Sequence, residues 1–149
     1  MFGPGILERQ EGQRRRCLEL GLSFAPPRVL SNSRPALEAA EFARDAGKHA
    51  EYHRAVLSAY FASSQDIGDV EVLAEAAEQV GLDSAALRCA LSDGLYAGRR
   101  EAARDEACSL GVTAVPTYIF PGTGGPRVVG AHSLDHFRRL LESLTAAVG

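Results

Sequence analysis

All of the strand-like sequence in this chain lies near its C-terminal end. The short apolar run Val115–Phe120 is followed by a Gly- and Pro-rich segment at 121–126. This pattern predicts a hairpin with strands at about 117–120 and 127–129. Two strands alone are only marginally stable in water. The hairpin therefore needs more sheet, and no strand-like run occurs before Val115.

The rest of the chain shows helical periodicity. Residues of the types that cap helix N-termini precede several of these segments, namely Asn32, Ser33, Asp69, Asp83 and Ser133. The sequence predicts helices at about 4–20, 35–46, 50–63, 70–80, after Asp83, at 96–110 and at 134–148.

Charge and composition exclude several classes of function. The net charge of the 149 residues is −3, which gives no electrostatic case for binding nucleic acid or an anionic membrane. No apolar window is long enough to predict a membrane span. The N-terminal segment lacks the basic and apolar regions of a signal peptide. We therefore expect a cytoplasmic protein with no nucleic acid and no membrane among its partners.

Pro116 stands at the entrance of the first predicted strand, where a proline cannot donate to a sheet ladder. A cis Val115–Pro116 bond would cost only about 0.5–1 kcal/mol over the trans form. It would leave the N–H and C=O of Val115 open to an extended chain lying alongside. The alternative is an ordinary trans proline at the start of an edge strand.

The three cysteines are Cys17, Cys89 and Cys108. No two are spaced as Cys-x-x-Cys, so the sequence contains neither a local redox pair nor half of a zinc site. Each stands beside apolar residues in a predicted helix, which favours free, buried and inert thiols. Cys108 lies nearest in sequence to the Val115–Pro116 loop, but a position at a helix C-terminus disfavours a thiolate.

Several motifs occur in the order typical of one family. They are Asn32-Ser-Arg-Pro-Ala-Leu-Glu-Ala-Ala-Glu-Phe-Ala, Tyr52-His-Arg-Ala-Val-Leu-Ser-Ala-Tyr-Phe, Asp66-Ile-Gly-Asp-Val-Glu-Val-Leu, Gly81-Leu-Asp, Gly111-Val-Thr-Ala-Val-Pro-Thr-Tyr-Ile-Phe and Val129-Gly-Ala-His. From about Gly12 onward the chain resembles the DsbA-like thioredoxin-fold family. The nearest branch is that of the cytoplasmic FrnE-type oxidoreductases, which are related to 2-hydroxychromene-2-carboxylate isomerases and kappa-class glutathione transferases.

The resemblance implies a helix-rich α/β fold, namely the C-terminal half of a thioredoxin-like fold with a DsbA-type helical insertion domain. Residues 1–110 would form the helical domain, and 111–149 the strand, strand and helix of the thioredoxin part. The first half of that fold, with its Cys-x-x-Cys or the serine of the sister branches, has no counterpart in this sequence. The implied substrate-binding residues are Thr113, Val115, Pro116 and His132, and no catalytic or metal-binding residue is expected.

The missing segment has two expected consequences. Without a dithiol, this polypeptide alone should have no dithiol oxidoreductase activity, which an insulin-reduction assay would test. Without the strand that pairs with it in the family, 117–120 would be an exposed edge. We therefore expect a homo-oligomer formed through this strand, or a cover supplied by another chain or segment. A truncated or mis-started form of a complete family member is an open alternative.

Three classes of function remain open. The first is a thiol–disulfide oxidoreductase, or a remnant of one, that holds a peptide or protein thiol along Val115 by strand addition. The second is a glutathione-dependent isomerase or transferase, with glutathione as the only small molecule implied and His132 as a contact. The string Gly-Ala-His-Ser at 130–133 departs from the acidic pattern of that branch. The third is a non-catalytic peptide-binding or assembly module.

Other polar residues point more weakly to function. His49 and His53 have a metal-compatible spacing, but they lack the His-Glu-x-x-His arrangement. Asn32, Ser33 and Arg34 could contact a substrate, although helix capping explains Asn32 and Ser33 more simply. Asp66 and Asp69 are interpreted as a turn and a cap, because the residues of a calcium loop are absent.

Overall fold

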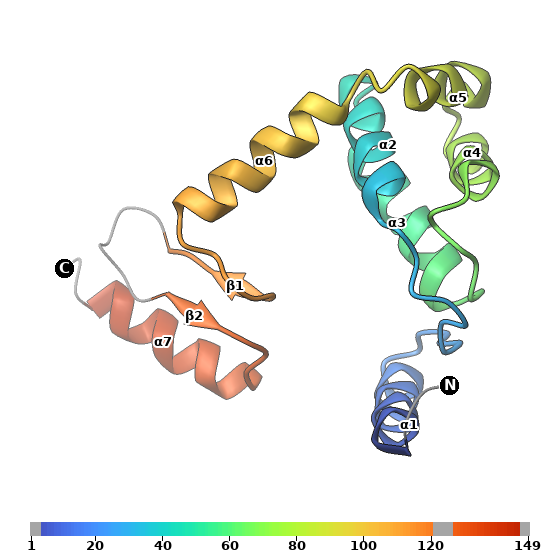
Figure 1. Cartoon of the computed structure of the whole chain (residues 1–149). Coiled ribbons are helices and arrows are strands. Elements are labelled where there is room, and N and C mark those ends of the chain that lie inside the picture. The colour runs from blue at the N-terminus through green and yellow to red at the C-terminus, as the bar shows by residue number, and fades with distance from the viewer. Residues whose placement is uncertain (1–3, 121–126, 147–149) are drawn as a thin grey trace. The chain divides into compact units, whose positions relative to one another are not determined.

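The structure is a computed structural model that describes residues 4–120 and 127–146. Its helices are α1 (Pro4–Glu19), α2 (Arg34–Asp45), α3 (His49–Phe61), α4 (Val70–Gln79), α5 (Ser84–Ser92), α6 (Ala97–Ser109) and α7 (Leu134–Ala146) (Figure 1). Its strands are β1 (Thr117–Tyr118) and β2 (Val128–Val129). The expected helix-rich α/β composition is confirmed. The predicted turn at 121–126 and the predicted end of the last helix at 148 lie outside the described residues.

The chain divides into two compact units, 1–102 and 103–149. The division falls within α6, so the last residues of this helix group with β1, β2 and α7. The boundary that the sequence suggested at residue 110 stays a prediction. Each unit is described by itself below.

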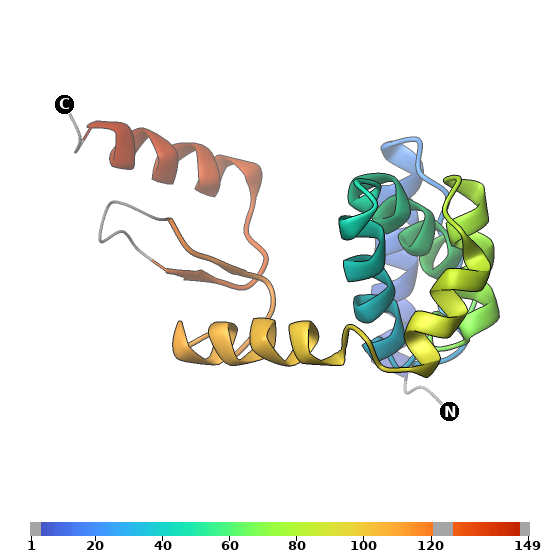
Figure 2. The same cartoon turned by 90° about the horizontal axis from the view of Figure 1, so that it is seen from above.

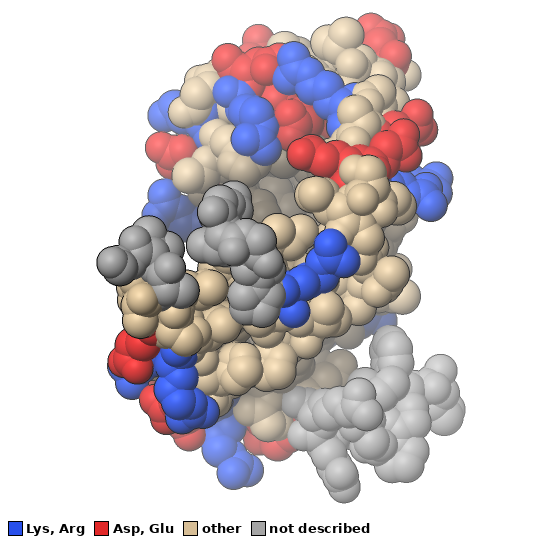
Figure 3. All heavy atoms as spheres, turned by 90° about the vertical axis from the view of Figure 1, so that its left-hand side faces the viewer, with Lys and Arg blue, Asp and Glu red and all other residues tan. Residues whose placement is uncertain are grey.

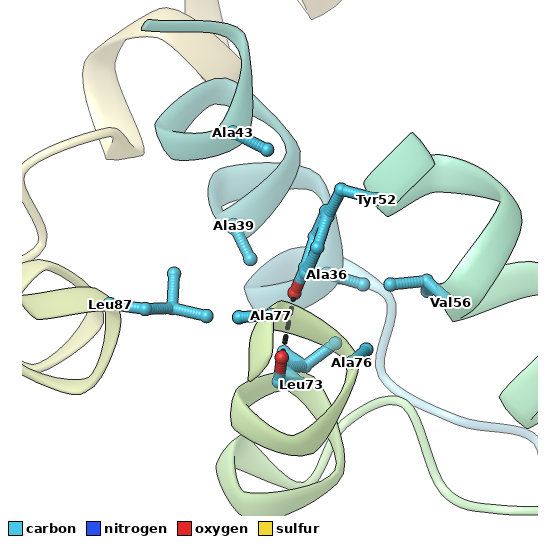
Figure 4. Packing of buried hydrophobic residues seen from close by; sticks show 9 residues of the cluster. All are labelled: Ala36, Ala39, Ala43, Tyr52, Val56, Leu73, Ala76, Ala77 and Leu87. Atoms are coloured by element: carbon cyan, nitrogen blue, oxygen red, sulfur yellow. Dashed lines mark hydrogen bonds between the residues drawn. The ribbon is translucent and has the colours of Figure 1, made fainter. Parts of the chain in front are cut away.

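The first unit is built around a core that four helices share. Figure 2 shows α2, α3, α4 and α5 side by side, and Figure 4 shows the side chains between them. Five of the nine core residues are alanines, and such small side chains let the helix backbones approach one another closely. The core consists of Ala36, Ala39, Ala43, Tyr52, Val56, Leu73, Ala76, Ala77 and Leu87.

Tyr52 is the one core residue with a polar side-chain atom. Its hydroxyl donates a hydrogen bond to the carbonyl oxygen of Leu73 at 3.1 Å, which connects α3 to α4 (Figure 4). Burial raises the pKa of this phenol, so the group stays neutral. A buried hydroxyl without such a partner would cost free energy, and the hydrogen bond removes that cost.

The predicted caps of two core helices are confirmed. Asp69 precedes α4, and its Oδ1 accepts a hydrogen bond from the Glu71 N–H at 2.9 Å. Asp83 precedes α5 in the same way, and its Oδ1 accepts from the Ala86 N–H at 2.9 Å. Each carboxylate satisfies a backbone donor that the helix itself leaves free.

The prediction that Ser33 caps α2 with its side chain is wrong. Ser33 has φ −77° and ψ −2°, and its hydroxyl makes no capping hydrogen bond. Capping requires an extended backbone at that position, whereas Ser33 is already helical. Asn32 takes over the role, because its Oδ1 accepts from the Arg34 N–H at 3.2 Å.

Charged groups fasten the first turn of α6 to α2. The carboxylate of Asp45 accepts from Arg99 Nη1 at 2.7 Å and from the Tyr96 hydroxyl at 3.1 Å. Arg100 Nε donates to Glu38 Oε1 at 3.0 Å, and both side chains of this second pair are mostly buried. These contacts fix where α6 starts on the helical unit.

We expect Tyr52→Phe to lower the free energy of unfolding by about 1 kcal/mol, because it removes one buried hydrogen bond and leaves the packing nearly intact. Equilibrium unfolding in urea, followed by circular dichroism, measures the change. The matched control is Tyr60→Phe, whose hydroxyl donates at 3.3 Å to the exposed carbonyl of Val29. An equal loss in both variants would contradict the role assigned to Tyr52.

The contact at Asp45 predicts a dependence of stability on pH. The Arg99 side chain, followed by the Tyr96 hydroxyl, donates to this carboxylate and lowers its pKa below the ordinary 3.8. A lowered folded-state pKa contributes stability that is present above the unfolded pKa and is lost as pH falls through the folded one. Asp45→Asn should therefore be less stable than wild type at about pH 7, and the gap should narrow as the pH falls below 3.8, the ordinary pKa of the carboxyl group.

Urea midpoints measured across this pH range test the expectation. Asp105→Asn is the control, because Asp105 is exposed on α6 and forms no ion pair with any described residue. A gap between wild type and Asp45→Asn that stayed constant down to the lowest pH would contradict the proposed interaction.

Candidate functional site

The predicted hairpin is confirmed, although its strands are shorter than the sequence suggested. β1 and β2 pair antiparallel, with Thr117 opposite Val129 and Tyr118 opposite Val128. Among the described residues the sheet contains these two strands and no third. One long side of β1 therefore has no strand beside it in the described part of the chain.

One hydrogen bond shows which backbone groups face that side. The Gly130 N–H donates to the Pro116 carbonyl at 2.8 Å, so Pro116 turns its carbonyl toward the strand that contains β2. Residues along an antiparallel strand alternate between facing the partner and facing away. Tyr118 therefore faces β2, whereas Thr117 and Ile119 turn their N–H and C=O groups away from it. We call these outward groups, with Val115 before them, the open edge of β1.

Val115 begins the open edge. The Val115–Pro116 peptide bond is cis, as the sequence suggested. The side chain of Val115 is 88% exposed, and its N–H and C=O have no hydrogen-bond partner among the described residues. Ile119, at the other end, is 42% exposed. The edge thus combines free backbone groups with apolar side chains, the combination that an added strand uses.

The loop before the open edge is held by short-range contacts. Thr117 Oγ1 donates to the Ala114 carbonyl at 2.6 Å. Gly111 ends α6 with φ +66°, a conformation that other residues rarely adopt. Arg127 Nη1 donates to the Gly111 carbonyl at 3.0 Å, which ties the approach to β2 to the end of α6. Thr113 lies exposed in this loop, between Gly111 and Val115.

His132 lies on the other side of the hairpin from the open edge. Its Nε2 is 3.2 Å from the Val129 carbonyl. Val129 is opposite Thr117, and both members of such a pair turn their backbone groups outward. The imidazole of His132 therefore sits at the outer edge of β2. The structure does not bring it together with Val115 at the open edge, and its role in binding stays a prediction.

The helix α7 runs beside the hairpin (Figures 1 and 2). The rings of Tyr118 and Phe137 meet edge to face at 4.6 Å between centroids. The predicted cap at Ser133 is confirmed, since its hydroxyl oxygen accepts from the His136 N–H at 3.2 Å. No residue of α7 is buried, and Leu134 is 65% exposed. The apolar face of α7 is thus only partly covered by the described residues.

The expectation of buried cysteines is wrong, whereas that of free thiols is confirmed. Cys89 and Cys108 are exposed, and Cys17 is half-buried. Apolar neighbours in sequence do not place a residue on the buried face of a helix, because each step turns the chain by about 100°. All three cysteines lie in the last turn of their helices. None is at a helix N-terminus, the position that stabilises a thiolate.

The histidines and aspartates that pointed more weakly to function make local structural contacts. The rings of His49 and His53 stack at 5.9 Å on the surface of α3, and Arg44 Nη2 approaches His49 Nε2 at 3.2 Å. Asp66 Oδ1 accepts from the Gly68 N–H at 2.9 Å, which forms a turn before α4. In the part of the chain that the structure describes, no group of three or more His, Cys, Asp or Glu is arranged to hold a metal ion.

Figure 3 shows basic and acidic side chains intermixed where charges gather, with mainly uncharged residues elsewhere on that face. Many of the arginines are paired with carboxylates, as Arg88 is with Glu71 at 2.8 Å. Among the described residues, no helix has the length and apolar character that crossing a membrane requires.

The sequence predicted Val115 and the edge at 117–120, but it did not show that Thr117 and Ile119 are the residues of this edge whose backbone groups face outward. Their orientation depends on the register of β1 against β2, and shifting that register by one residue would reverse it. The signal in the sequence is the position of Pro116. A proline has no N–H and can only accept through its carbonyl. Its position in the sequence therefore does not show which residues of the strand face the partner and which face away.

Two comparisons with known proteins identify the family of this chain. The family described as DSBA-like thioredoxin domain matches residues 13–142. The uncharacterized protein YwbO of Bacillus subtilis (strain 168) is 38% identical over 107 residues, which cover 71% of this chain and 52% of YwbO. The match thus spans about half the length of that relative. The resemblance seen in the sequence is confirmed, and the chain belongs to the family of DSBA-like thioredoxin domains.

Proposed function

We propose that this chain serves thiol–disulfide exchange by holding an extended, thiol-containing peptide along the open edge of β1. Its family supports this chemistry, because DsbA-like proteins act on thiols and disulfides. The observation that carries the proposal is the outward orientation of the Thr117 and Ile119 backbone beside an exposed Val115. A peptide that lies alongside can pair with these groups as an added strand.

The open edge suits a substrate that varies in sequence. Backbone hydrogen bonds do not depend on the side chains of the bound peptide, and each contributes about 0.5–1.5 kcal/mol net. The exposed side chains of Val115 and Ile119 add apolar contacts at alternate positions. Such an edge would bind peptides of many sequences with modest affinity. This suits a protein that must release each substrate after the exchange.

In this proposal the dithiol comes from outside these 149 residues. A disulfide is exchanged when a thiolate attacks one sulfur and the other sulfur leaves as a thiolate, so two thiols are needed to complete a cycle. No two of Cys17, Cys89 and Cys108 share a Cys-x-x-Cys, and each lies at the end of its helix. The chain would bind the substrate, and a segment or partner outside it would supply the redox pair.

The same edge accounts for the remaining ligands and partners. Glutathione is a short thiol peptide, and we propose it as a small ligand of this edge. A second copy of the chain could pair along the edge in place of a peptide, giving a homodimer. Without a thiol ligand the chain would act as a non-catalytic binding module. The free thiols fit a reducing compartment such as the cytoplasm.

Ile119→Pro tests the proposal. The N–H of Ile119 faces the open edge, so its loss should leave the pairing of β1 with β2 intact and remove one hydrogen bond to a bound peptide. Calorimetric titration with reduced insulin B chain should give a dissociation constant raised at least about fivefold. Sedimentation equilibrium should show weaker self-association of the same variant.

The matched control is Ile119→Ala, which retains the N–H and removes most of the side chain. It should bind the peptide with affinity closer to that of wild type, and circular dichroism should show that both variants are folded. Unchanged peptide binding by Ile119→Pro would exclude the open edge as the binding site. Equal losses in the two variants would assign binding to the side chain instead of the backbone.

A further inference from the structure

The helical unit contains a hollow between α1 and α3, apart from the open edge and with no part in the function proposed above. This cavity is open to solvent and has a volume of about 620 Å³. Cys17 lines it from α1, Leu22 and Phe24 from the following loop, and Arg54, Leu57 and Phe61 from α3. A volume of this size lies within the range of pockets for small organic molecules.

The loop after α1 shapes the cavity. Gly21 ends the helix with φ +70°, and the Leu22 N–H donates to the Cys17 carbonyl at 2.8 Å, which turns the chain sharply. The ring of Phe24 then stacks on that of Phe61 at 6.4 Å. The Ala25 N–H donates to the Phe61 carbonyl at 2.7 Å. These contacts fasten the loop to the end of α3 and leave α1 as the opposite wall.

The walls of the cavity are mainly apolar and stay accessible. Leu22 is 56% exposed, and Leu57 and Phe61 are each 42% exposed. These large apolar side chains line one hollow but remain in contact with water. Each Å² of apolar surface left exposed forgoes about 25 cal/mol of stabilising free energy. A ligand with an apolar body would recover that free energy.

Among the lining residues whose side chains the structure describes, Arg54 is the one charged residue, and none of them is acidic. Its Nε donates to the Ala50 carbonyl at 3.2 Å, one turn earlier on α3. Its two terminal nitrogens have no hydrogen-bond or ion-pair partner among the described residues. A guanidinium with these two donors free is suited to a carboxylate, which it can bind in a two-pronged arrangement.

We propose that this cavity binds a small carboxylic acid with an apolar body, of the medium-chain fatty acid class. The carboxylate pairs with the terminal nitrogens of Arg54. The hydrocarbon chain lies against Leu57 and Phe61, toward the wall formed by Cys17. The positive charge of Arg54, the apolar walls and the lack of an acidic side chain among the described lining residues together select an anion with a hydrophobic tail over a neutral or cationic ligand.

Cys17 provides a direct readout, because its thiol lies on the cavity wall whereas Cys89 and Cys108 belong to other helices. Iodoacetamide forms a carbon–sulfur bond with a thiol and releases iodide, and mass spectrometry of peptides gives the rate at each cysteine. Decanoate below its micelle concentration should slow alkylation of Cys17 at least about fivefold at saturation. It should leave Cys89 and Cys108 unchanged, and 1-decanol should protect Cys17 much less.

Variants distinguish the contribution of the Arg54 charge to ligand binding from that of the apolar wall. Arg54→Gln should raise the decanoate concentration needed for half protection about tenfold, because it removes a charge-assisted hydrogen bond. Arg54→Lys should retain much of the protection, and Leu57→Asn should weaken it through the wall. Arg138→Gln on α7 is the control and should behave as wild type, with circular dichroism confirming the fold of each variant.

The proposal is overturned if decanoate fails to protect Cys17 in the wild type. It is also overturned if decanol protects as well as decanoate, if Arg54→Gln leaves the midpoint unchanged, or if all three cysteines are protected alike. None of these outcomes bears on peptide binding at β1, so the two proposals fail or stand separately.

Discussion

The hydrogen bond from the Gly130 N–H to the Pro116 carbonyl, at 2.8 Å, determines which backbone groups of β1 face away from β2. It fixes the parity of β1, so that Tyr118 faces β2 while Thr117 and Ile119 face outward. A shift of one residue would exchange these roles and bury the outward groups in the hairpin. The open edge of β1 and the outward carbonyl of Val129, which His132 contacts, both follow from this one register.

The two units rely on different physical interactions. The helical unit has a buried core of alanines, leucines and Tyr52 that four helices share. In the C-terminal unit Val128 is the one buried residue among those described, and α7 buries none. The second unit therefore gains little from burial within itself, which is why we assign its free surfaces to binding.

The sequence predicts the local features of this fold better than the long-range ones. The caps at Asp69 and Asp83 are correct because a carboxylate and the next helical N–H groups interact within one turn. The predicted cap at Ser33 was wrong because the surrounding chain places its backbone in a helical conformation, in which the side chain makes no capping hydrogen bond. The burial of Cys89 and Cys108 was wrong because the sequence does not show which face of a helix finds a partner.

For the candidate sites, too, the sequence predicts local features better than long-range ones. The motif at Val115–Pro116 locates the loop that we propose for binding, but only the pairing of the two strands shows that the backbone of Thr117 and Ile119 faces outward. The cavity beside Arg54 needs α1, a loop and α3 to meet, and no sequence spacing encodes that meeting. Family resemblance added the chemistry of thiols, which neither the fold nor the three cysteines would have suggested alone.

Hydrogen exchange at the amides of residues 117–119, followed by NMR at a concentration where the chain is monomeric, tests the central claim most directly. The account predicts slow exchange at Tyr118 and fast exchange at Thr117 and Ile119, because only the first donates within the hairpin. Reduced insulin B chain should slow Thr117 and Ile119 selectively. Equal protection of all three amides in the free monomer, or no response to the peptide, would contradict the open edge as a binding site.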